Sequence, residues 1–161
     1  MMSTYDTDYG IWLAEQINHL KSHEWEQLDV DNLIDELEAL NKSNKRELYS
    51  YLVVILAHLL KWQFQPARRG GSWLGSINNG RRRIERLFKD QPSLKPYVKE
   101  ILSEAYLEAR EWAVEETGLN IFPPTCPYKT QEVLSKEFLP VSQHDIELTQ
   151  DNTEQKEEEI D

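Results

Sequence analysis

Apolar residues recur at helical spacing over residues 30–64, and this stripe constrains the fold more than any other feature of the chain. The stripe consists of Leu33, Leu37, Leu40, Leu48, Tyr51 or Leu52, Ile55, Leu59 and Trp62. Steps of three and four residues place side chains on one face of an α-helix. The segment Asn41-Lys42-Ser43-Asn44 interrupts the stripe, but it contains neither glycine nor proline, and the phase continues across it. We therefore predict one long, bent or straight, helix from about residue 30 to 64, with a hairpin split at 41–44 as the alternative.

Other periodic segments predict three more main helices and a short last one. The first covers residues 5–22, and its apolar face consists of Tyr9, Leu13, Ile17 and Leu20. The third starts at Ser72 and runs through Phe88, and the fourth starts at Ser93 or Leu94. Gly118 stands where a glycine commonly ends a helix. A short helix follows Thr130 and ends at Pro140.

No segment has a strand pattern, so the expected fold is all-α. It is a single-domain helical bundle of four main helices plus a short C-terminal helix, organised around the long second helix. A chain of 161 residues is long enough for one domain with a sizeable core. We predict a helical domain over residues 1–142. Residues 143–161 contain eight acids and one lysine without apolar periodicity, which predicts a disordered acidic tail.

Composition and termini indicate the cellular environment. Cys126 is the single cysteine, so no internal disulfide is possible, and the cytoplasm is the expected location. The first residues lack a basic segment followed by an apolar one, so no secretory signal is expected. No run approaches the roughly 18 apolar residues that a membrane span requires, so no membrane association is expected.

The basic residues are concentrated between Lys61 and Lys95, where nine Lys or Arg stand against two acids, while the whole chain has a net charge of −11. This segment joins the apolar end of the long helix to the third helix through a loop over residues 67–71. An acidic protein is a poor default binder of nucleic acid, because contact with phosphates needs a concentrated positive face. Only this segment offers such a face.

Several short motifs resemble those of a known family. They are LDVDNLIDELEAL, LAHLLKWQFQP, SW followed by RRRI, PSL, EETGL, FPPTCPY and a terminal FLP. From about Tyr5 to Pro140 the chain resembles the bacterial family catalogued as domain of unknown function number 29, and the run from His58 to Trp62 is the most specific match. The resemblance implies an all-helical bacterial protein, common in cyanobacteria, and implies no activity, cofactor or partner. Asn41 stands where the family often has glycine, which favours a continuous helix.

His58 is the candidate for chemistry, because helical spacing places it on the same stripe as Ile55 and Trp62. A half-buried histidine near Lys61 and a carboxylate such as Glu36 has the composition of an acid–base pair. The interpretation we favour is a core histidine bonded to a backbone carbonyl, with the Lys61 amine reaching water. No nucleophile, metal-ligand cluster or cofactor motif is present, so we expect no metal and no cofactor.

Arginines and tryptophans around the loop form the candidate binding groove. Its residues are His58, Lys61, Trp62, Arg68, Arg69, Trp73 and Arg82. Arginine beside aromatic rings suits phosphates and stacked bases, although the third helix can equally dock on acids of its own chain. Arg68 and Arg69 lack neighbours on a helix face, so we expect a ligand there and expect Arg82 or Arg83 to be structural.

Two function classes follow from these candidates. The first is a non-enzymatic binding or interaction module, whose partner is an unknown protein or an anionic ligand, with nucleic acid as a less favoured partner. The second is an enzyme that uses Glu36 and His58 as acid and base on an anionic substrate. No feature of the sequence raises the second class above the first, and none indicates the oligomeric state.

Overall fold

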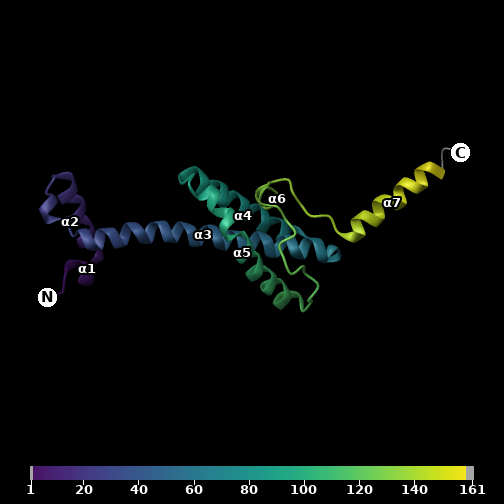
Figure 1. The fold of residues 1–161 in the computed structure, drawn as a ribbon, viewed down its shortest axis with the longest axis horizontal. Helices are drawn as coiled ribbons and strands as arrows, with labels where there is room; N and C mark the ends of the chain where they lie inside the picture. Colours follow the sequence, from purple (N-terminus) through teal and green to yellow (C-terminus); the bar gives the residue numbers. More distant parts are fainter. Residues whose placement is uncertain (1, 159–161) are drawn as a thin grey trace. The chain divides into compact units, whose positions relative to one another are not determined.

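The structure is a computed structural model that describes residues 2–158, with side chains described for residues 2–150 (Figure 1). In chain order the helices are α1 (Thr4–Thr7), α2 (Tyr9–Lys21), α3 (Val30–Phe64), α4 (Gly71–Asp90), α5 (Leu94–Thr117), α6 (Thr130–Leu134) and α7 (Gln143–Glu158). Short 3₁₀ turns η1 (Trp25–Gln27) and η2 (Pro66–Arg68) precede α3 and α4. The described residues contain no strand, which confirms the predicted all-α fold.

The long helix α3 is continuous from Val30 to Phe64, as the unbroken phase of its stripe indicated, and it is not split at 41–44. It ends before Pro66, whose ring disfavours helical angles in the residue before it. The chain divides into two compact units, Met1–Asn44 and Lys45–Asp161. The predicted division into a domain over 1–142 and a tail over 143–161 remains a prediction.

The N-terminal unit pairs α2 with the first turns of α3 through polar contacts. The hydroxyls of Tyr5 and Tyr9 donate to the Glu36 carboxylate at 2.7 and 2.9 Å. The Trp12 indole donates to Asp29 at 3.0 Å, and the Asp29 backbone N–H donates to the Gln16 side chain at 2.7 Å. Because low residue numbers on α2 meet high ones on α3, the two helices run antiparallel.

These contacts correct the apolar face predicted for the first helix. Trp12 and Gln16 are the buried residues of α2, whereas the predicted face is exposed, namely Tyr9, Leu13, Ile17 and Leu20. The start of the α3 stripe is exposed as well, with Leu37 at 65% and Leu40 at 64%. Hydrogen bonds to Asp29 and Glu36 turn the side of α2 that carries Trp12 and Gln16 toward α3. The leucines of α2 therefore remain exposed.

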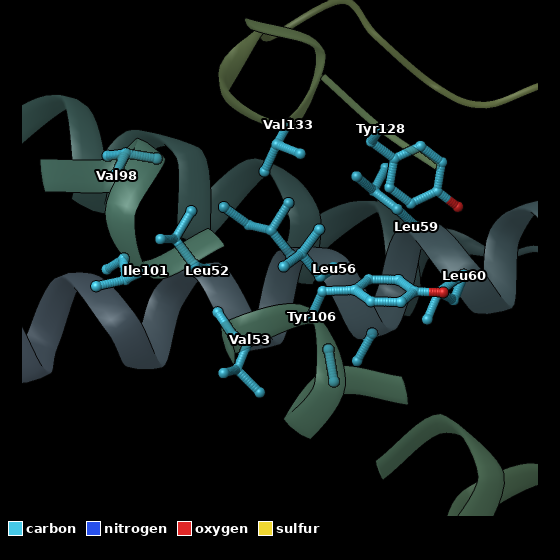
Figure 2. Packing of buried hydrophobic residues seen from close by; sticks show 14 of the residues in the cluster. Leu52, Val53, Leu56, Leu59, Leu60, Val98, Ile101, Tyr106, Tyr128 and Val133 are labelled. Carbon is cyan, nitrogen blue, oxygen red and sulfur yellow. The ribbon is translucent and has the colours of Figure 1, made fainter. Parts of the chain in front are cut away.

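The C-terminal unit has a continuous apolar core, which begins on α3 at Leu48. Figure 2 shows α3 residues such as Leu52 and Leu56 packed against Val98, Ile101 and Tyr106 of α5. The proline-rich segment after α5 closes one end of the core. The Tyr106 hydroxyl donates to the Pro123 carbonyl at 2.6 Å, and the ring of Phe122 meets that of Phe64 edge to face.

Residues 143–158 of the predicted acidic tail form α7, and its last residues, 159–161, lie outside the described part. The helix has a reciprocal cap, because the Asp145 backbone N–H donates to Ser142 Oγ and the Ser142 N–H donates to Asp145. Serine followed three residues later by an acid is a recognised start signal for a helix. The motif Ser-Gln-His-Asp was therefore the sequence signal for this helix.

Gly80 of α4 lies close to α3 at Ile55. A Cβ added there would lie 2.7 Å from Ile55 Cγ1 and 3.1 Å from Ile55 Cδ1, and Ile55 is fully buried. Overpacking costs about 1–3 kcal/mol, and the helix propensity of alanine offsets about 1 kcal/mol of that. We expect Gly80→Ala to lower the free energy of unfolding by about 1 kcal/mol, measured by denaturant titration.

Gly75 provides the matched control, since it lies in the same helix and an added Cβ would meet no atom within 4 Å. Gly75→Ala should raise the free energy of unfolding by up to about 1 kcal/mol. Equal stabilisation by both substitutions would contradict the close approach at Gly80.

Candidate functional site

The predicted groove residues all lie in the C-terminal unit, where they separate into two internal clusters and two exposed arginines, whereas the catalytic candidate Glu36 does not lie there. His58, Lys61 and Trp73 contribute to one cluster, and Trp62 and Arg69 form the other. Arg68 and Arg82 are exposed. Glu36 belongs to the N-terminal unit, where it accepts hydrogen bonds from Tyr5 and Tyr9.

Lys61 is a buried cation whose partner the sequence did not reveal. Its ammonium donates to Glu116 Oε2 at 2.5 Å, and its side chain is 5% exposed while that of Glu116 is 42% exposed. The rings of Trp73 and Trp112 lie 5.4 and 5.5 Å from the Lys61 ammonium, within range of cation–π attraction. The amine therefore reaches a carboxylate between two indoles and does not reach into water.

Glu116 is held through both of its oxygens. The Trp112 indole donates to Oε1 at 2.7 Å while Lys61 donates to Oε2. The hydrogen bond from Lys61 lowers the pKa of Glu116, with a smaller contribution from Trp112. The carboxylate consequently stays ionised and paired, which makes this cluster a closed structural network.

His58 lies beside this network on α3. Its Nδ1 donates to the Val54 carbonyl at 2.7 Å, so the neutral ring carries its proton there and leaves Nε2 as an acceptor. The Trp112 ring meets the imidazole edge to face at 5.6 Å. Burial lowers the pKa of His58, so the ring is neutral near neutral pH. The bond from His58 to the carbonyl of Val54, one helical turn earlier, is typical of a histidine with a structural role.

Arg69 is engaged within the chain, contrary to the expectation that it is free for a ligand. Its guanidinium forms two hydrogen bonds to Asp145, at 3.0 and 2.7 Å, and its Nε donates to the Trp62 carbonyl at 2.8 Å. It also lies over the Trp62 ring, at 5.2 Å from the centroid. The hydrogen bonds from Arg69, with further contributions from Ser142, lower the pKa of Asp145 well below its usual range. The sequence missed this pair because Asp145 was assigned to the tail.

Arg81 is the arginine that the fold buries, whereas Arg82 and Arg83, one of which was expected to be structural, are exposed. Arg81 is 3% exposed, its Nε donates to the Val133 carbonyl at 2.9 Å, and its Nη2 donates to the Glu132 carbonyl at 3.1 Å. Its Nη1 is buried and has no hydrogen-bond partner among the described residues. Burial lowers the pKa of Arg81 to about 10.

A pocket of about 640 Å³ opens beside Arg81. Its lining residues are Arg81, Ile84, Glu85, Phe88, Lys89, Pro92, Lys95, Leu134 and Lys136. Lys136 forms an exposed ion pair with Glu85 at 2.8 Å, whereas Lys89 and Lys95 form no ion pair within the part of the chain whose side chains are described. The pocket therefore combines an apolar lining with an excess of positive charge, and its volume is typical of small-molecule sites.

The part of the pocket that α4 contributes could have been found from the sequence, whereas the part contributed by residues 134–136 could not. Ile77, Arg81, Ile84 and Phe88 follow one another at steps of four, three and four residues, which places Arg81 on the buried face of α4. Leu134 and Lys136 approach from more than 40 residues away, and local periodicity carries no information about them. The described residues bring together no group of three or more potential metal ligands, and none of their helices has the length and apolarity to cross a membrane.

Comparison with known proteins adds one match. The sequence model of the family described as "Domain of unknown function DUF29" matches residues 4–139. No curated protein and no solved structure matches the chain. Because the match covers most of the chain, including both units as far as the end of α6, the protein belongs to this family of domains of unknown function.

Proposed function

We propose that the protein is a non-enzymatic binding protein, and that the pocket beside Arg81 takes a small organic anion with an apolar body. The observation that supports the proposal most is the state of Arg81. Its guanidinium is buried, two of its nitrogens donate to carbonyl oxygens, Nη1 has no partner among the described residues, and the side chain lines the pocket.

The charge of Arg81 favours an anionic ligand. Carbonyl oxygens accept its hydrogen bonds but do not neutralise it, and a buried charge without a counter-ion is costly. Glu85 is the acid in the lining, and it is already paired with Lys136. A carboxylate or similar anion brought by a ligand would compensate Arg81 and attract Lys89 and Lys95 at the same time.

The remaining lining favours an apolar body on that anion. Ile84, Phe88, Pro92 and Leu134 are the uncharged lining residues. Pockets of this size bind ligands mainly through apolar contact, and a few polar groups fix the orientation. The lining supplies no serine, cysteine or histidine, and Glu85 is already paired. Its three lysines are exposed, whereas a lysine acts as a nucleophile when the protein desolvates it. Binding is consequently better supported than catalysis.

Isothermal titration calorimetry of the full chain with octanoate tests the proposal. Octan-1-ol is the control that lacks the charge, and acetate is the control that lacks the apolar chain. A charge-assisted hydrogen bond contributes about 1.5–3 kcal/mol, so octanoate should bind roughly ten- to a hundredfold more tightly than octanol. Acetate should show no measurable heat, because it lacks the apolar body. Equal affinity for octanoate and octanol would contradict the anion site.

Two double variants that remove the same charge, one inside the pocket and one outside it, distinguish binding in the pocket from attraction to the basic residues in general. Lys89→Gln with Lys95→Gln should weaken octanoate binding roughly tenfold, because both lysines line the pocket. Arg83→Gln with Lys99→Gln removes the same charge from exposed positions outside the lining and should leave the affinity unchanged. Similar losses in the two double variants would assign the binding to bulk charge.

A further inference from the structure

The N-terminal unit exposes a set of large aliphatic side chains, which we name the N-terminal apolar face. It consists of Leu13, Ile17, Leu20, Val30, Ile34, Leu37 and Leu40. Among its described residues the same unit buries one large apolar side chain, Trp12. A helical pair normally orders by burying its apolar stripe against another element. Exposed apolar patches rimmed by polar residues mark interaction sites.

Helix geometry places these side chains on one side of the pair. On α2, Leu13, Ile17 and Leu20 lie roughly 40–140° around the axis from Trp12 and Gln16, at about 100° per residue. On α3, the members of the face lie about 40–160° from Glu36 in the same rotational sense. Because the helices are antiparallel and meet at Trp12, Gln16, Asp29 and Glu36, equal senses of rotation bring both sets to the same side.

Charge identifies the kind of partner. Residues 1–44 contain ten acids and two lysines, a net charge of −8, and eight of those acids are exposed. A second copy would bring the same negative charge to the interface, and like charges facing each other oppose association. We propose that the N-terminal apolar face docks a cationic amphipathic helix of a partner protein. Apolar side chains of that helix cover the leucines, and its Lys or Arg residues pair with the surrounding acids.

The test uses a fluorescein-labelled helical peptide of about five turns, with leucine at positions i, i+3, i+4 and i+7 and lysine elsewhere. Fluorescence anisotropy with the full chain should show saturable binding that weakens as salt is added. A peptide with the same composition in scrambled order, which has no apolar face, should bind at least roughly tenfold more weakly. Equal binding of the two peptides would reduce the interaction to bulk charge and overturn the proposal.

Substitutions locate the binding site on the face. Leu37→Ser and Ile17→Ser change exposed side chains, so the circular dichroism should remain that of the parent, and each should weaken peptide binding roughly tenfold. Leu107→Ser changes an α5 leucine that is 54% exposed and lies outside the face, and it should leave binding unchanged. Equal effects of Leu37→Ser and Leu107→Ser would overturn the proposal. So would a concentration-dependent dimer in sedimentation that Leu37→Ser abolishes, because the face would then bind a second copy.

Discussion

The free energy of unfolding should fall by about 3 kcal/mol when Glu116 is replaced by alanine, because the substitution leaves Lys61 buried without a counter-ion. Lys61 has 5% of its side chain exposed and cannot reach water without disturbing the indoles of Trp73 and Trp112. Glu116 itself is 42% exposed, so its own desolvation contributes little to the loss. Denaturant titration at neutral pH measures the change.

A double-mutant cycle separates the pair from its surroundings. Lys61→Met keeps the apolar length of the side chain and removes the buried charge, so we expect a loss below about 1 kcal/mol. The double variant Lys61→Met with Glu116→Ala should be more stable than Glu116→Ala alone, since no charge is left unpaired. Additive losses would show that Lys61 finds water or another partner, and would contradict the closed network.

The same pair predicts a pH dependence. The folded-state pKa of Glu116 is lowered, so the unfolded chain binds the proton more readily. The stabilisation is therefore fully present above the unfolded value of about 4.3 and is lost as the pH falls through the lowered folded value. The difference in unfolding free energy between the parent and Glu116→Gln should be constant from neutral pH to about 5 and should shrink at more acidic pH.

Arg81→Ala should destabilise the protein by about 3 kcal/mol, because it leaves the carbonyls of Val133 and Glu132 without their donors. Val133 is fully buried, so water cannot replace the lost hydrogen bond to its carbonyl without opening α6. The matched control is Arg82→Ala on the same helix, whose exposed side chain should contribute no more than about 0.5 kcal/mol. If the two variants lose stability equally, Arg81 does not anchor α6.

The existence of the helices was predictable from the sequence, whereas the side that α2 buries and the exposure of the first half of the α3 stripe were not. The α3 stripe keeps its phase from Val30 to Phe64, so one helix follows from periodicity. Leu48, Leu52, Ile55 and Leu59 of the stripe are buried, while Leu37 and Leu40 are exposed. Burial depends on which elements cover the stripe, and hydrogen bonds to Asp29 and Glu36 select the face that α2 covers.

Local sequence patterns likewise could not predict which residues pair with Lys61 and Arg69. Lys61 pairs with an acid 55 residues away, and Arg69 pairs with one 76 residues away. No spacing rule connects such positions, so Glu36, which helical spacing places on the matching flank of earlier turns, was considered as the partner of His58. Arg81 differs from its two arginine neighbours in lying between Ile77 and Ile84 on one helix face, and that signal was present in the sequence.

¹H–¹⁵N correlation spectra of the full chain during titration with octanoate would show whether the pocket beside Arg81 binds an apolar anion. We expect saturable shifts at the amides of residues 84–95 and 134–136, which contain most of the pocket lining. Amides of residues 57–62 and 112–116 should stay unchanged, because the Lys61–Glu116 network is closed. Shifts concentrated on the N-terminal apolar face, or no shifts at saturating octanoate, would show that the pocket beside Arg81 is not an anion site.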